Sequence, residues 1–217
     1  MPFKAPSPSG PPEASLVSPL PFLAEPGAGG LAAALEGPGC CAVEPGVDDE
    51  IALAEVTAAR AAGGMALAVT AHQAIGSDLA FVFTSALARR LGLAAERTDA
   101  IATALQEALA NAVMHGSLEM SGFSRESTDA FLHFSETATA RLADPAFGGR
   151  AVVVAARWTA ADIEIAVLDR GRGYLSEDLA SRPWREASGR GLTIIADLAD
   201  QVSFSARGSR IAMRFHR

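Results

Sequence analysis

The 217-residue chain carries a formal net charge of −7, and 49% of its residues are hydrophobic against 20% that are charged. This composition fits a globular protein, and the acidic balance argues against a dedicated nucleic-acid binder, which needs a basic face for the phosphates. Lys4 is the only lysine, which excludes a Walker-A loop and a eukaryotic-type protein kinase from the folded part, because both need a lysine there.

The first 48 residues differ in composition from the rest of the chain. Ten of the twelve prolines lie before residue 46, among many glycines, serines and alanines. Such a segment buries too little apolar surface to offset the entropy lost on ordering it. We therefore predict a disordered tail over residues 1–48. A short apolar patch within it, at 16–23, could dock on a partner or on the domain itself.

Cysteine usage and hydropathy bear on where the protein works. Cys40 and Cys41 are neighbours, and because a disulfide between neighbours is strained, we predict two unpaired thiols in a reducing compartment. The N-terminus lacks the basic region, apolar run and cleavage site of a secretory signal. The most apolar later stretch, 66–83, is interrupted by polar residues and is not typical of a membrane span. We expect a cytoplasmic protein with no membrane association.

The rest of the chain, residues 49–217, is predicted to form one domain with an insertion at about 117–150. The predicted elements are a strand at 65–70, helices at 78–91, 96–115 and near 128–142, strands at 151–157 and 163–168, a helix at 192–199, and strands at 202–206 and 210–215. Short turns make the late strands antiparallel neighbours. We predict an α+β two-layer sandwich, with a mixed or antiparallel sheet and helices on one face.

The predicted helix at 96–115 carries a line of polar residues. Glu107, Asn111 and His115 fall within about 80° of one another on a helical wheel, because each step of four residues drifts by about 40°. An asparagine carbonyl suits Mg²⁺, and a glutamate one turn earlier could accept a proton from an attacking hydroxyl. The same spacing is also typical of a solvated helix face. For His115, a role at the helix end is favoured over catalysis.

Two glycine-containing loops follow in the chain. Asp169 ends an apolar strand and precedes Gly171 and Gly173, which allow a ligand to approach the backbone. The aspartate could accept a hydrogen bond from the exocyclic amine of adenine; the alternative is a tight turn.

The second loop runs from Gly189 through Arg190 and Gly191 to Leu192 and opens a helix, whose exposed amides suit a phosphate. The alternative is a flexible linker. A dinucleotide fingerprint is not favoured, because Ser176 and Ile194 stand where its third glycine would be.

Together, the motifs E107-A-L-A-N111-A-V-M-H115-G116, D169-R-G171-R-G173 and G189-R-G191-L resemble the N, G1 and G2 boxes of the GHKL ATPase superfamily. The closing R207-G-S209-R-I-A-M-R-F resembles its terminal hairpin, and the resemblance covers about 65–217. It implies the Bergerat fold, Asn111 as the magnesium ligand and Glu107 as the general base. Asp169, with Ser209, would bind adenine, and the segment 189–192 would cradle the phosphates of ATP.

Within this superfamily the chain looks most similar to the anti-sigma-factor serine kinases. This similarity implies a regulatory kinase that uses MgATP to phosphorylate a serine of a STAS-type antagonist, with a sigma factor as a second partner, and that forms a homodimer. Since the domain has no lysine, Arg172 and Arg190 are the candidates for positive charge near the phosphates. A non-catalytic ATP-binding module that sequesters a partner is the alternative, and an ATPase subunit is disfavoured by the lack of a transducer domain.

Overall fold

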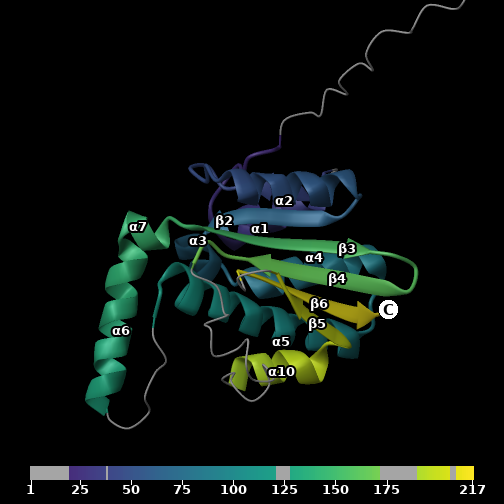
Figure 1. Cartoon of the computed structure of the whole chain (residues 1–217). Helices are drawn as coiled ribbons and strands as arrows, with labels where there is room; N and C mark the ends of the chain where they lie inside the picture. Colours follow the sequence, from purple (N-terminus) through teal and green to yellow (C-terminus); the bar gives the residue numbers. More distant parts are fainter. Residues whose placement is uncertain (1–19, 38, 121–127, 172–189, 206–208) are drawn as a thin grey trace, which may run out of the picture.

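The computed structural model describes residues 20–37, 39–120, 128–171, 190–205 and 209–217 (Figure 1). A six-stranded sheet has the order β1-β2-β3-β4-β6-β5. Strands β1 and β2 are parallel, and the other neighbours are antiparallel, so the sheet is mixed. The strands are β1 (Cys41–Val43), β2 (Met65–Thr70), β3 (Ala151–Trp158), β4 (Asp162–Leu168), β5 (Gln201–Phe204) and β6 (Arg210–His216).

Helices connect and cover these strands. They are α1 (Gly27–Glu36), α2 (Glu50–Ala61), α3 (Ala71–Gly76), α4 (Leu79–Leu91), α5 (Ala95–Asn111), the π-helix η1 (Ala112–Ser117), α6 (Thr128–Ala143), α7 (Pro145–Gly148) and α10 (Arg190–Leu198). The α+β class with a mixed sheet is confirmed. In the part of the chain that the structure describes, no helix is long and apolar enough to span a membrane.

Strand β3 is buried on both faces, which explains its unbroken apolar sequence. Val152 and Val154 face a core that contains Phe83 of α4 and Leu105 of α5. The alternate residues of β3 face a second cluster with Val56 of α2. Successive strand residues point to opposite faces, so each face needs its own cover. Helix α2 therefore covers a face of the sheet to which the sequence analysis assigned no helix (Figure 1).

Residues 20–37 and 39–48 correct the prediction of a disordered tail over 1–48. They form α1 and β1, and Leu31 and Leu35 of α1 are almost completely buried. The backbone N–H of Leu23 donates to the Val43 carbonyl at 2.9 Å, and β1 pairs with β2. The average composition did not indicate this order. A leucine pair at i, i+4 and a three-residue strand are enough to order the segment once a core lies beneath them. Residues 1–19 lie outside the described ranges.

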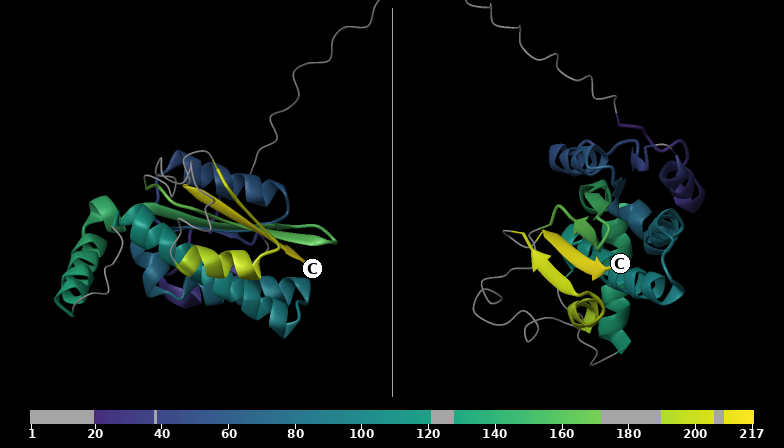
Figure 2. Two further views of the ribbon diagram at one scale, coloured as in Figure 1. Left: turned by 60° about the horizontal axis from the view of Figure 1, so that its bottom comes forward. Right: turned by 90° about the vertical axis from the view of Figure 1, so that its right-hand side faces the viewer.

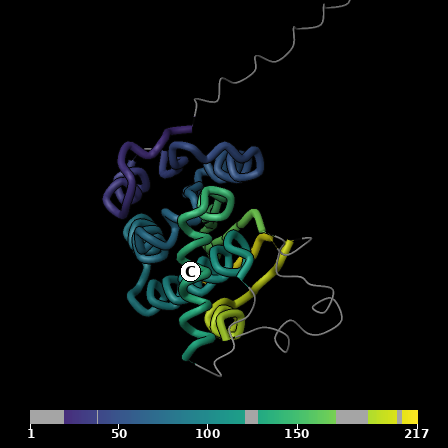
Figure 3. The backbone as a smooth tube through the Cα atoms, turned by 90° about the vertical axis from the view of Figure 1, so that its left-hand side faces the viewer, coloured from purple at the N-terminus to yellow at the C-terminus, as the bar shows by residue number. Residues whose placement is uncertain are grey.

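The predicted free thiols are confirmed, but both are buried rather than part of a tail. Cys40 contributes to the core on the α4 side of the sheet and Cys41 to the cluster beneath α2. Figure 3 shows α1 and α2 at one end of the molecule and α10 at the other.

The insertion at about 117–150 contains the predicted helix, now α6, followed by the short α7. Helix α6 projects from the body of the molecule (Figures 1 and 2), and it has no buried residue. Its packing partners include α7 and α3. The insertion is therefore attached to the body near one end of β3, where α7 leads into that strand.

Candidate functional site

Helix α5 places Glu107 and Asn111 side by side at its C-terminal end. Both side chains are half-buried, while Leu105 and Ala108 on the same helix are completely buried. Neither polar side chain makes a hydrogen bond or an ion pair with another residue of the described ranges. Two half-exposed oxygen-bearing side chains that no described residue pairs with suit a ligand that brings its own donors.

The first turn of α10 packs directly on these two side chains. A Cβ atom at Gly191 would lie 2.8 Å from Glu107 Oε2 and 3.2 Å from Asn111 Nδ2. A side chain at Gly191 would crowd Glu107 and Asn111, so the predicted G2 segment and the predicted N-box helix do meet. Arg190, the first residue of α10, is exposed, whereas Leu192 is buried in the core and anchors the helix.

Helix α5 changes geometry immediately after Asn111. The sequence predicted an α-helix to His115, but residues Ala112–Ser117 form a π-helix, in which the Leu118 N–H donates to the Val113 carbonyl at 2.8 Å. Single π turns are frequent at functional sites because they widen the helix locally. His115 is exposed, and its Nδ1 lies 2.8 Å from the Met120 carbonyl, which supports a role at the helix end.

The π-helix brings Gly116 against the end of β4. A Cβ atom at Gly116 would overlap the Asp169 carboxylate, and one at Gly171 would overlap the Gly116 backbone. From the sequence, Gly116 was only the last residue of the first motif, and its contact with Asp169 and Gly171 was not predicted. Its place at the end of the polar helix was the available signal, but only the fold shows that it faces Asp169.

Asp169 is the most buried charged residue of the site, at 2% exposure. Burial raises the pKa of its carboxyl to about 6, although the Gly171 N–H bond and the nearby Arg170 charge both act to lower that pKa. The Gly171 N–H donates to Oδ1 at 2.7 Å, and in the described ranges no donor reaches Oδ2. The backbone N–H of Asp169 donates to the Ser209 carbonyl at 3.0 Å, which places Ser209 beside it. A donor on a ligand would therefore find an unused acceptor here.

The predicted site residues thus fall into three groups. Glu107, Asn111 and Gly191 lie together, and Asp169, Gly171 and Ser209 form a second cluster that Gly116 of the same α5–η1 helix adjoins. Gly173, Gly189 and Arg172 lie outside the described residues. The arrangement offers a carboxylate and a carboxamide at the end of α5, facing the start of α10, with a buried carboxylate just after β4.

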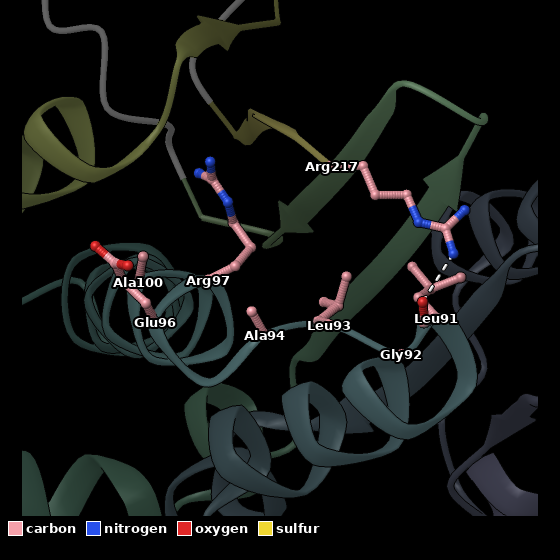
Figure 4. Close-up of a pocket in the computed structure, with 8 residues that line it drawn as sticks. All are labelled: Leu91, Gly92, Leu93, Ala94, Glu96, Arg97, Ala100 and Arg217. Carbon is pink, nitrogen blue, oxygen red and sulfur yellow. Dashed lines mark hydrogen bonds between the residues drawn. The ribbon is translucent and has the colours of Figure 1, made fainter.

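A cavity of about 430 Å³ lies elsewhere, at the beginning of α5 (Figure 4). Gly92, Arg97 and Arg217 are among its lining residues, and Arg217 Nη2 donates to the Leu91 carbonyl at 2.8 Å. Glu107 stands ten residues after Arg97, which at a rise of about 1.5 Å per residue separates the two by roughly 15 Å along the helix. This cavity is therefore separate from the cluster around Glu107 and Asn111.

Comparison with known proteins agrees with the geometry. No curated protein matches the chain as a significant relative. The family profile described as the histidine kinase-like ATPase domain matches residues 69–215, from the end of β2 to β6, a span that contains every site residue named above. Helices α1 and α2 and strand β1 precede the matched span. The chain therefore belongs to the histidine kinase-like ATPase domain family.

Proposed function

We propose that the protein is a regulatory serine kinase that binds MgATP and phosphorylates a serine of a STAS-type antagonist. The observation that carries this proposal is the contact of Gly191 with Glu107 and Asn111, since it brings the start of α10 to the candidate base and metal ligand. Family membership implies ATP binding. The kinase activity, the STAS-type client, competition by a sigma factor and a homodimeric state are the further parts of the proposal.

Asp169 would accept a hydrogen bond from the adenine amine through Oδ2, the oxygen that Gly171 leaves unused. Such a contact selects adenine over guanine, because guanine carries a carbonyl at the corresponding position. Ser209 would help to bind the base from the adjoining strand. At the other side, the N-terminal amides of α10 would face the phosphates, where the helix dipole favours negative charge, and Arg190 would add a full positive charge.

The donor set at Asn111 fits Mg²⁺. The described residues contain no group of three His, Cys, Asp or Glu side chains that could hold a metal without help. Mg²⁺ commonly keeps waters and takes substrate phosphates as ligands, so a single protein oxygen from Asn111 is sufficient. When bound, the ion would neutralise charge on the phosphates. Glu107 would accept the proton of the client's serine hydroxyl. The serine oxygen would bond to the γ-phosphorus as the bond from that phosphorus to ADP breaks.

The test is phosphate transfer from γ-labelled ATP to a STAS-type protein of the same organism, followed by mass spectrometry of the product. We expect one phosphate on a serine of the client and loss of the transfer in Glu107→Gln. Glu96→Gln is the matched control, because Glu96 is an exposed glutamate on the first turn of the same helix.

Three outcomes separate the alternatives. Transfer that depends on Glu107 supports the kinase. ATP binding without transfer to any STAS-type protein tested overturns it in favour of the non-catalytic module that sequesters a partner. A folded chain that binds no ATP would contradict both. Light scattering of the purified chain with and without ATP tests the homodimer separately.

A further inference from the structure

Two arginines and a phenylalanine of the insertion form a compact group at its attachment to the body. We define the clamp as Arg141 of α6, Phe147 of α7 and Arg150, which immediately precedes β3. The guanidinium carbons of Arg141 and Arg150 lie 5.1 and 4.8 Å from the centre of the Phe147 ring. Arg150 Nε also donates to the Ala146 carbonyl at 2.9 Å. Contacts between a guanidinium and an aromatic face are attractive and restrict both partners.

The clamp binds the backbone at the last residue of the π-helix and at the two residues after it. Arg141 Nη1 donates to the carbonyls of Leu118 and Glu119 at 2.6 and 2.9 Å. Arg150 Nη1 donates to the Ser117 carbonyl at 3.0 Å and forms an ion pair with Glu119 Oε1 at 2.8 Å. The last carbonyls of a helix have no partners within the helix, and cationic side chains there are favourable. The clamp thus supplies partners for three consecutive carbonyls.

The backbone that the clamp holds is unusual. Glu119 has a φ of 51°, in the left-handed region that non-glycine residues rarely occupy. Such a conformation persists only where its surroundings enforce it. Two hydrogen bonds or ion pairs to arginines, one on the Glu119 carbonyl and one on its carboxylate, provide that enforcement.

This segment is one residue from the nucleotide site. Gly116 immediately precedes Ser117, whose carbonyl Arg150 holds, and the Gly116 backbone lies against both Asp169 and Gly171. A shift of the π-helix end would move Gly116 relative to the Asp169 carboxylate. Asn111 lies before the π-helix and is constrained by α5 itself. A loosened clamp should therefore disturb the adenine side of the site more than the phosphate side.

We propose that Arg141 and Arg150 are positioning residues for adenine recognition, and that the clamp couples the projecting helix α6 to Asp169 through Gly116. This inference rests on the proposed function, since it assumes that Asp169 binds adenine. The opposing view is that the clamp only attaches the insertion to the body. That view predicts a change in stability without a change in the preference for adenine.

The experiment measures binding of MgATP and MgGTP by calorimetry to the full chain and to Arg141→Met and Arg150→Met. We expect each variant to bind ATP at least about tenfold more weakly, as for a lost charged hydrogen bond, with little change for GTP. Arg157→Met is the matched control. Arg157 lies on β3 and forms an ion pair with Glu55 at 3.2 Å, with its side chain 33% exposed against 26% for Arg150.

The design keeps the two proposals distinguishable. If the wild-type chain prefers ATP and the clamp variants lose that preference while Arg157→Met keeps it, the inference stands. An unchanged ATP-to-GTP ratio in the clamp variants overturns it, even where their melting temperatures fall. If the wild-type chain binds neither nucleotide, or does not distinguish them, the proposed adenine-binding role of Asp169 is wrong, and the inference about the clamp is wrong with it. Arg141→Met carries the test should Arg150→Met not fold, because α6 has no buried residue.

Discussion

The two ends of helix α5 use their polar residues in opposite ways. At its beginning, Arg97 forms an ion pair with Asp200 at 3.8 Å, and Asp200 also accepts the His216 N–H at 2.7 Å, all near the surface. At its end, Glu107 and Asn111 have no partner within the described ranges. Beyond them the helix widens into a π turn, and a buried carboxylate lies against Gly116.

This difference separates stability from binding along a single helix. Arg97 and Asp200 pair with one another at the beginning of α5. At the other end, burial of the Asp169 carboxylate costs free energy, and a ligand that donated a hydrogen bond to it would offset that cost. The comparison predicts that substitutions at the end of α5 alter nucleotide binding, whereas equivalent substitutions at its beginning leave binding unchanged.

The largest expected effect is that of Asp169→Ala on ATP binding. If Asp169 accepts the adenine amine as proposed, removing this buried carboxylate should weaken binding by about a hundredfold or more, because the amine loses a charged acceptor. Calorimetry with MgATP measures this loss. Asp200→Ala is the control, because Asp200 pairs with Arg97 at the beginning of α5. This variant should bind ATP as the wild type does. Similar losses of ATP affinity in both variants would contradict the difference between the two ends of α5.

A second expected effect concerns the pH dependence of stability. Burial raises the Asp169 pKa to about 6, so the folded protein holds the carboxyl proton more tightly than the unfolded chain does. Stability from this group is therefore present at low pH and falls as pH rises from about 4 to 6. The total loss is about 2–3 kcal/mol, at 1.36 kcal/mol per pKa unit.

Urea unfolding of the wild type and Asp169→Asn between pH 4 and 8 tests this expectation. The neutral asparagine escapes the cost of a buried charge, so the variant should become the more stable protein above pH 6 while binding ATP poorly. A stability difference that does not change with pH would show that the Asp169 carboxyl titrates normally.

Gly116→Ala should have the next largest effect. The added methyl group would overlap the Asp169 carboxylate, and such overpacking typically costs about 1–3 kcal/mol. We expect a lower free energy of unfolding together with weaker ATP binding. Gly76→Ala is the control, because a Cβ atom there meets nothing within 4 Å. Equal stability and affinity in both variants would contradict the close contact.

The smallest effect is expected for Arg97→Ala at the beginning of α5. Its ion pair with Asp200 is about one-third exposed on each side, and such pairs contribute about 0–1 kcal/mol. Thermal unfolding should show a small decrease that shrinks further at high salt, and ATP affinity should not change. A change in ATP affinity would mean that the two ends of the helix are coupled.

Much of this molecule follows from local sequence patterns. The strand at Met65–Thr70 is found with the predicted bounds, and α4, α6, β3 and β4 each differ from prediction by one residue at one end. These features depend on periodicity and on helix-ending glycines, which act between near neighbours in the chain. The same periodicity placed Glu107 and Asn111 together, and motif order indicated the ATPase family that the comparison confirms.

Contacts between distant segments decided the rest. Composition predicted disorder for the segment that forms α1 and β1. That prediction was wrong because Leu31 and Leu35 are buried against a core built by later residues, which composition does not record. The approach of Gly116 to Asp169 and the hydrogen bonds of the two arginines to the backbone after it each join residues from separate elements. The sequence by itself indicated the family and named the candidate site residues. Burial and the approach of one backbone to another decided how they meet, because both depend on long-range packing that no local pattern records.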